Sequence, residues 1–140
     1  MRYEKSCGAV VYTRVGTEIR YLLIANKGGI YGFPKGHVEG KETEIETALR
    51  EVCEETNLKI DLDPKFRAVD EYPLAKKRNT LRQIVYFLGY FENQNIVFQK
   101  EELSGAYLVD FKEAERRIQF DSTRKILKMA NDYLAKSTND

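Results

Sequence analysis

Three glutamates, Glu51, Glu54 and Glu55, lie close together in the segment GHVEGKETEIETALREVCEETNL, residues 36–58. In a helix, which turns by about 100° per residue, their carboxylates would share about a third of the circumference. Like charges three or four residues apart repel and destabilise a helix, so this grouping needs a compensating positive charge. Carboxylates, together with a backbone carbonyl and water, are ligands that Mg²⁺ takes in proteins. The segment is therefore a candidate divalent metal site.

An ordinary solvated helix face is the alternative, because Arg50 is placed to pair with Glu54 four residues later. Glu44 points roughly the same way. The loop before the helix favours the metal site, since Gly36, Gly40 and Glu42 come just before the helix and can bring backbone carbonyls close to the carboxylates. A cation bound there would relieve the repulsion among the glutamates.

Capping residues delimit the helix that carries these glutamates. Thr43, followed three residues later by Glu46, fits a capping box, and Asn57 tolerates the left-handed conformation that ends many helices. One narrow apolar face is expected to be buried, with the glutamates beside it. It consists of Ile45, Ala48, Leu49, Val52 and Thr56.

Strands and two further helical segments account for most of the remaining chain. Runs of β-branched and aromatic residues predict strands, and helical spacing follows near the C-terminus. The expected strands are 7–13, 19–25, 65–74, 82–92 and 105–110, and the expected helical segments are 111–118 and 122–136. The glycine-rich stretch 26–42 predicts a long shaped loop without regular structure. This order predicts a mixed sheet with helices on its faces, in one domain spanning residues 1–140.

The composition sets limits on partners and location. With 23 basic and 22 acidic residues, the formal net charge of +1 gives no global field, so neither nucleic acid nor an anionic membrane is an expected partner. Cys7 and Cys53 do not resemble a secreted disulfide framework and predict free thiols in a reducing compartment. No apolar run of signal-peptide or membrane-span length occurs, which predicts a soluble cytoplasmic protein.

The segment 36–58 resembles the Nudix box, G-x5-E-x7-R-E-U-x-E-E-x-G-U, where U is an aliphatic residue. The matching residues are Gly36, Glu42, Arg50, Glu51, Val52, Glu54, Glu55 and Leu58. Asn57 departs from the pattern, standing where the family has a glycine, and Asn is the next best residue for a positive φ. The resemblance implies an α/β (α+β) fold over the whole chain, the Nudix α/β/α sandwich with a mixed sheet and the Nudix loop-helix-loop.

The same resemblance implies a metal site and a base. The residues that would bind Mg²⁺, with Mn²⁺ as an alternative ion, are Gly36 through its carbonyl, Glu51, Glu54 and Glu55. Arg50 would orient the carboxylates, and Glu42 would support the loop. Glu54 is the expected base for the attacking water, which bound metal makes nucleophilic. In some members a glutamate of a later loop is the base, and Glu101 and Glu102 are the candidates here.

The residues before the helix resemble the diadenosine tetraphosphate hydrolases of animal and archaeal type, whose loop reads W-x-x-P-K-G-H-V-E-x-G-E. The stretch YGFPKGHVEGKE, residues 31–42, follows the same order. By this resemblance Lys35 would offer a positive charge to a phosphate. His37, the only histidine, would lie near the phosphate chain as a hydrogen-bond donor or acid, and its alternative is an ordinary loop histidine.

The segment EYPLAKKRNTLRQIVYFL, residues 71–88, aligns loosely with the same family. In that alignment Tyr72 would stack on an adenine, and Lys77 and Arg82 would bind outer phosphates. The alternative for these basic residues is a solvated turn. The family's second base-stacking aromatic has no clear counterpart, and Tyr107 is the nearest candidate.

Together these resemblances imply Mg²⁺-dependent, asymmetric hydrolysis of diadenosine tetraphosphate to ATP and AMP. One alternative is another Nudix pyrophosphohydrolase, acting on nucleoside triphosphates, ADP-ribose or RNA 5′ ends. A nucleotide sensor that does not cleave and a Ca²⁺-binding or scaffold module are the alternatives from other classes. No pattern in the sequence indicates an oligomeric state.

Overall fold

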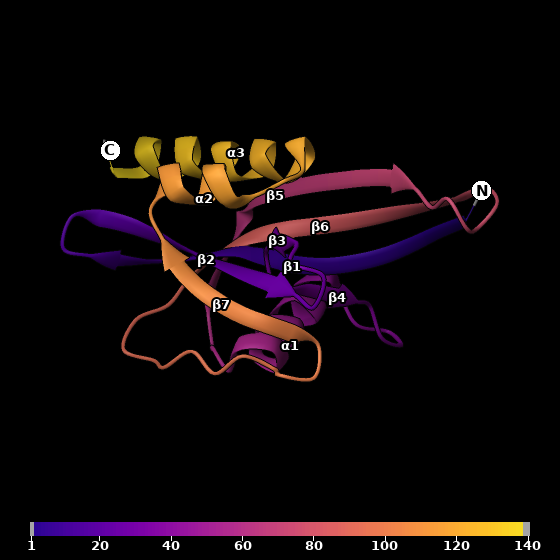
Figure 1. Cartoon of the computed structure of the whole chain (residues 1–140), viewed down its shortest axis with the longest axis horizontal. Coiled ribbons are helices and arrows are strands. Elements are labelled where there is room, and N and C mark those ends of the chain that lie inside the picture. The colour runs from indigo at the N-terminus through magenta and orange to yellow at the C-terminus, as the bar shows by residue number, and fades with distance from the viewer. Residues whose placement is uncertain (1, 139–140) are drawn as a thin grey trace.

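A seven-stranded mixed sheet lies at the centre of the fold (Figure 1). The structure, a computed structural model, describes residues 2–138. The strands are β1 (Arg2–Val15), β2 (Glu18–Asn26), β3 (Tyr31–Gly32), β4 (Lys35–His37), β5 (Asp61–Pro73), β6 (Thr80–Tyr90) and β7 (Leu103–Val109). Their order is β3-β2-β1-β6-β5, with β4 paired to β1 and β7 paired to β2. β1 and β6 are parallel and the other pairs are antiparallel, which confirms the predicted mixed sheet.

Three helices cover the two faces of this sheet: α1 (Glu44–Thr56) lies on one face, and α2 (Phe111–Arg117) and α3 (Asp121–Thr138) lie on the other (Figure 1). Successive side chains of a strand point to opposite faces, and β1 shows this alternation. Ala9 and Val11 share a buried cluster with Val52 of α1. Val10, between them, shares a cluster with Leu127 of α3. The α/β/α sandwich is thus confirmed.

The two C-terminal helices lie where the spacing predicted them. Asp110 caps α2 by accepting a 2.8 Å hydrogen bond from the backbone N–H of Glu113. α3 is amphipathic and buries Ile126, Leu127 and Ala130. None of the helices within residues 2–138 is long and apolar enough to cross a membrane.

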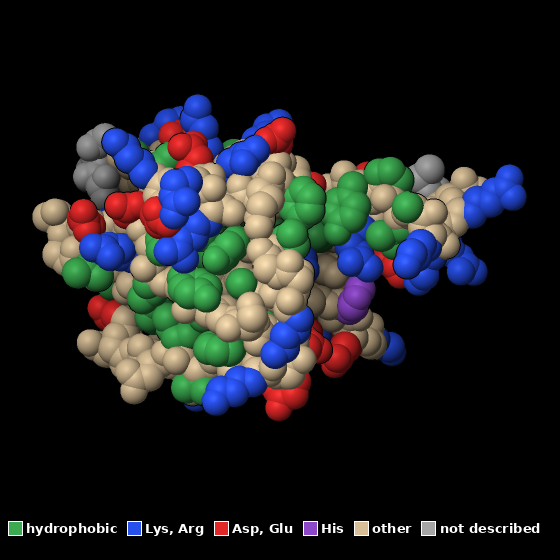
Figure 2. All heavy atoms as spheres, in the orientation of Figure 1, with side chains coloured by type: hydrophobic (Ala, Val, Ile, Leu, Met, Phe, Trp, Pro, Cys, Tyr) green, Lys and Arg blue, Asp and Glu red, His purple; other side chains and the backbone are tan. Residues whose placement is uncertain are grey.

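Three strands continue beyond the helices as a projection that we call the β arm, residues 2–5 and 71–82 (Figure 1). Within it β5 and β6 are antiparallel, and Tyr72 lies opposite Arg82. Lys and Arg side chains gather toward its free end (Figure 2). β1 begins at Arg2 rather than at the predicted residue 7, because its pairing with β6 continues through a polar stretch that carries no strand-like pattern of its own.

The prediction that residues 26–42 lack regular structure was wrong at two points, since β3 and β4 lie inside this stretch. β4 pairs with β1, with Gly36 opposite Cys7 and Lys35 opposite Gly8. A Cβ at Gly8 would lie 2.0 Å from the Pro34 carbonyl oxygen, so the pairing depends on the missing side chain there. This contact between distant segments is invisible to local patterns.

The capping of α1 is as predicted. The Thr43 hydroxyl and the Glu46 carboxylate exchange hydrogen bonds with each other's backbone N–H, and Asn57 ends the helix at φ 64°. The predicted buried face is partly wrong. Ile45 and Leu49 are 37% and 38% exposed, whereas the buried residues are Thr47, Ala48, Val52, Glu55 and Thr56. The buried face of α1 lies nearer to β4 than predicted, because β4 packs against one side of the helix while the rest of the sheet packs against its face.

Glu44 does not join the other glutamates but anchors α1 to the sheet. It accepts two hydrogen bonds from the Arg67 guanidinium, at 2.9 and 2.8 Å, and pairs with Lys5 of β1. These hydrogen bonds, the Arg67 ones above all, lower the pKa of the Glu44 carboxyl from 4.5 to about 2. A lowered folded-state pKa stabilises the fold above pH 4.5, and this contribution is lost as pH falls toward 2.

We therefore expect Glu44→Gln to lower the free energy of unfolding by about 1 kcal/mol at pH 7, a value discounted for solvent screening. The loss should shrink below pH 4.5, so that it is clearly smaller at pH 3 than at pH 7, and it should nearly disappear at about pH 2, where half of the wild-type carboxylate is protonated. Urea titrations at these pH values measure it. Glu115→Gln, at an exposed position of α2, is the matched control, and equal stability of the two variants at pH 7 would refute the anchoring role.

Candidate active site

A cavity of about 940 Å³ opens between β4 and α1 at one end and β5 and the start of α3 at the other. Strand register sets the order of the residues across its floor. One row runs from Asp70 on β5 through Ile84 and Ser6 to His37 on β4. Neighbouring strands lie about 4.8 Å apart, so about 14 Å separate the two ends. The cavity is long enough for a ligand with two chemically different ends.

Arg50 links the carboxylates at the α1 end of the cavity. Its guanidinium donates to Glu42 at 2.6 and 2.9 Å, to Glu51 at 2.8 Å and to Glu54 at 3.2 Å. It also donates to the backbone carbonyl of His37 at 2.9 Å. The Arg50 hydrogen bonds lower the pKa of the Glu42 carboxyl to about 2. One cation thereby ties the helix to the loop and fixes two of the three glutamates.

Glu42 completes this connection from the loop side. Its carboxylate accepts a 3.0 Å hydrogen bond from the Glu39 N–H and another from the Thr47 hydroxyl. The loop therefore closes on itself just before the helix begins. This places Gly36, and with it β4, beside the carboxylates of α1.

The Glu51 side chain lies directly against the backbone of Gly36. A Cβ at residue 36 would lie 2.0 Å from the Glu51 carboxyl carbon. Only a glycine leaves space for that carboxylate against the backbone of β4. Burial raises the pKa of the Glu51 carboxyl, and the hydrogen bond from Arg50 opposes this shift.

Glu55 is the buried member of the three glutamates, and its position beside the apolar stripe was predicted wrongly. It is 7% exposed, and its Oε2 has no hydrogen-bond partner among the described residues. Burial raises the pKa of this carboxyl to about 8, the Lys35 charge opposing and the Glu51 charge adding to the shift. A buried carboxylate oxygen without a partner is costly, and a divalent cation would supply the missing contact.

The residues present thus fit a hard divalent ion, although the side chains do not surround one as they stand. Within residues 2–138, no three His, Cys, Asp or Glu side chains form a cluster that would hold a metal. Glu51 and Glu54 point instead to Arg50. The oxygen donors, the orphaned Glu55 oxygen and the space at Gly36 are what Mg²⁺ requires of a protein.

Lys35 and His37 line the same end of the cavity. Lys35 lies close enough to Glu55 to act on its carboxyl electrostatically. His37 is exposed, and its Nδ1 lies 3.4 Å from the Ser6 hydroxyl. Both side chains therefore adjoin the candidate metal ligands.

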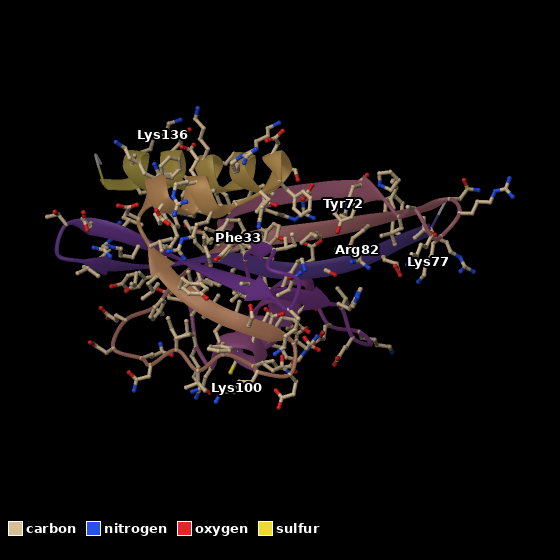
Figure 3. All side chains as sticks on the ribbon, in the orientation of Figure 1. Phe33, Tyr72, Lys77, Arg82, Lys100 and Lys136 are labelled. Carbon is tan, nitrogen blue, oxygen red and sulfur yellow. The ribbon has the colours of Figure 1, made fainter. Side chains whose placement is uncertain are left out.

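The β-arm residues predicted to bind substrate divide into two groups. Tyr72 and Arg82 line the cavity, whereas Lys77 does not. Lys77 pairs with Glu4 at 2.7 Å, and it lies farther along the arm (Figure 3). The Nε of Arg82 is buried without a hydrogen-bond partner among the described residues, and Glu4 lies 3.8 Å from its guanidinium. Arg82 thus lines the cavity with a positive charge and has one buried donor without a partner among the described residues.

Sequence reasoning missed the other residues that line the cavity with Tyr72 at this end. Phe120, 55% exposed, lines it from the link between α2 and α3, and Ser122 and Thr123 line it from the first turn of α3. Asp70 lines it from β5 and accepts a 3.1 Å hydrogen bond from Ser122. The one signal in the sequence was a phenylalanine, Phe120, placed just before the expected helical segment 122–136.

The remaining candidates for the base and for the second stacking aromatic also differ in whether they line the cavity. Glu102 lines it, and Glu101 is not among the lining residues. Tyr107 packs against Tyr31, with ring centroids 5.9 Å apart, under the Arg117 guanidinium. Of these two tyrosines, Tyr31 lines the cavity and Tyr107 lies behind it.

Comparisons with known proteins agree with this architecture. A family model described as NUDIX domain matches residues 3–129. The chain is 28% identical to the asymmetrical bis(5′-nucleosyl)-tetraphosphatase of Mus musculus, over 93% of this chain and 95% of that protein. The structure of a C. elegans Ap4A hydrolase binary complex shares the fold with a TM-score of 0.87 at 22% identity, over 95% of this chain and 98% of that one.

The fold also occurs in a protein of another description. The NUDIX domain of Shewanella oneidensis NrtR, solved in complex with ADP ribose, has a TM-score of 0.73 at 15% identity, over 96% of this chain and 90% of that one. At this level of identity the likeness shows the fold alone. The family model covers most of the chain, and its range contains every cavity residue described above. The chain therefore belongs to the Nudix hydrolase family.

Proposed function

We propose that the protein is a Mg²⁺-dependent, asymmetric dinucleoside polyphosphate hydrolase that cleaves diadenosine tetraphosphate to ATP and AMP. The observation that carries this proposal is one continuous cavity with acidic ligands at one end and two aromatic rings, Tyr72 and Phe120, at the other. Basic side chains lie at both ends. Such an order suits a base, a ribose and a chain of phosphates.

The acidic end would perform the hydrolysis. Mg²⁺ held by Glu51, Glu54, Glu55 and the Gly36 carbonyl would neutralise phosphate charge and make a water nucleophilic near neutral pH. Glu54, 53% exposed at its side chain and facing the cavity, accepts the proton of that water. Arg50 keeps the Glu54 carboxylate in place while it acts. The water attacks one phosphorus, the bond to the bridging oxygen breaks, and a nucleoside monophosphate and a triphosphate leave.

The basic residues would hold the remaining phosphates. Lys35 adjoins the carboxylates and would act as a point charge on phosphate, and Arg82, which lines the cavity, would supply a second positive charge. Lys77, beyond the cavity on the β arm, is available to the end of a longer chain after giving up Glu4. His37, at the same end of the cavity as Lys35, would donate a hydrogen bond to phosphate.

Tyr72 and Phe120 would hold a base between them. Both are large aromatic side chains that line the cavity although they are 38% and 55% exposed. Exposed aromatic rings facing a polar cavity provide stacking surface for a base, which is worth about 1–3 kcal/mol. Phe120 thus fills the role for which Tyr107 was the nearest candidate.

A substrate panel tests the proposal. We expect diadenosine tetraphosphate and pentaphosphate to be hydrolysed with Mg²⁺ at rates far above those of dNTPs, ADP-ribose and 5′-triphosphorylated RNA, with ATP always among the products. Chromatography of the nucleotides after incubation measures this. If the protein prefers one of the other substrates, diadenosine tetraphosphate is refuted as the substrate, while the proposed hydrolytic chemistry still holds. Tight binding without any turnover would favour a nucleotide sensor.

A further inference from the structure

A carboxylate and two hydroxyls lie at the aromatic end of the cavity, and the hydrolysis described above does not use them. Asp70, Ser122 and Thr123 all line this end. Asp70 and Tyr72 are two residues apart on one strand, so their side chains share a face of β5. Ser122 follows Phe120 by two residues at the start of α3. The polar group therefore adjoins both rings between which we place the base.

The Asp70 carboxylate is fixed in this position. Ser122 donates to its Oδ2 at 3.1 Å, a contact that joins β5 to the first turn of α3. No described residue donates to its Oδ1 in the structure. Asp70 is half-buried, and its charge reaches the buried Tyr86 phenol, whose pKa burial raises first and Asp70 raises further. A positioned carboxylate with a free oxygen at a cavity wall is an acceptor site for hydrogen-bond donors.

We propose that Asp70, held by Ser122, reads the hydrogen-bonding edge of the base beside Tyr72 and Phe120 and selects guanine over adenine there. A carboxylate only accepts hydrogen bonds. Guanine presents two adjacent donors, N1–H and the 2-amino group, which match its two oxygens. Adenine presents one amino donor beside the N1 acceptor, which repels a carboxylate. The inference rests on the proposed nucleotide site and adds that, at this end of the cavity, guanine is preferred to the adenine of diadenosine tetraphosphate, which remains a substrate.

The test compares kcat/KM for the dinucleoside tetraphosphates of guanosine, inosine and adenosine. Inosine keeps N1–H and lacks the 2-amino group. For the wild type we expect guanine to exceed adenine by about tenfold, as for one bidentate base contact, with inosine between them. Equal rates for guanine and adenine, or a preference for adenine, would overturn the proposal.

Asp70→Asn is the decisive variant, because an amide carries one donor and one acceptor. The Asn side chain can pair with adenine through two hydrogen bonds. With guanine, its NH₂ group would face one of the two guanine donors, so one hydrogen bond is lost. We expect the preference to reverse, with adenine rates rising while guanine rates fall. A misfolded variant would lose both. Asp61→Asn, an exposed position on the same strand, should keep the wild-type ratio, and an unchanged ratio in Asp70→Asn would reject the role of Asp70.

Binding separates a failure of this inference from a failure of the proposed function. If the wild type hydrolyses no dinucleoside polyphosphate, calorimetric titration with GMP, IMP and AMP in Mg²⁺ measures the same ratio without catalysis. A guanine preference that reverses in Asp70→Asn would then support base reading in a protein with another substrate. Equal affinities for the three monophosphates would remove the inference together with the function.

Discussion

Replacing Glu54 by Gln is expected to lower turnover of diadenosine tetraphosphate by about 10²–10⁴-fold, the contribution of a positioned general base. An amide has the same shape as the carboxylate, and it cannot take the proton of the attacking water. The Glu54 side chain is 53% exposed, and among residues 2–138 Arg50 is its one hydrogen-bond partner, so the free energy of unfolding should change by less than about 0.5 kcal/mol. Initial rates at saturating substrate and urea unfolding measure the two effects.

Neighbouring glutamates supply the controls for this experiment. Glu102 lines the cavity and is the competing base, whereas Glu101 does not line it. Glu101→Gln should retain full activity, and Glu102→Gln should lower it far less than Glu54→Gln. Near-complete loss in Glu102→Gln combined with activity in Glu54→Gln would transfer the role of base to the later loop.

Local signals predicted much of this fold because they depend on neighbouring residues alone. Thr43 and Glu46 form the predicted capping box, and Asn57 takes the predicted positive φ. The strands were found where alternation and β-branched residues were strong. The Nudix pattern itself encodes spacing within one loop and one helix, which is why the carboxylates could be named from the sequence.

The missed features all depend on contacts between distant segments. Glu55 lies in the buried part of α1 because β4 packs beside it, and nothing in the helix periodicity reports that strand. Phe120 and Asp70 face one cavity although 50 residues of chain separate them. Composition cannot distinguish Lys77 from Arg82 in the same basic stretch. Strand register does, since Arg82 lies opposite Tyr72 in the part of β6 that forms the cavity floor.

Replacing Gly36 by Ala should reduce activity by about 10²-fold or more while the protein stays folded, because catalytic geometry tolerates displacements of well under 1 Å. The added Cβ would lie 2.0 Å from the Glu51 carboxyl carbon. That carboxylate is the end of a flexible side chain, so it can move away at little cost in stability. It would leave Arg50, to which it is bonded at 2.8 Å, and it would move away from the backbone of Gly36, beside which it would bind Mg²⁺.

Two other glycines make this prediction specific to the site. At Gly8 the added Cβ would lie 2.0 Å from the Pro34 carbonyl oxygen, and this backbone atom cannot move as easily as the end of a side chain. Gly8→Ala should therefore lower the melting temperature as well as the activity, whereas Gly28→Ala, whose nearest contact is 3.4 Å, should change neither. Circular dichroism melts and hydrolysis rates on the three variants distinguish these outcomes. If Gly36→Ala keeps wild-type activity, the Glu51 carboxylate has no fixed role in hydrolysis; if it unfolds with Gly8→Ala, the glycine serves the fold rather than the site.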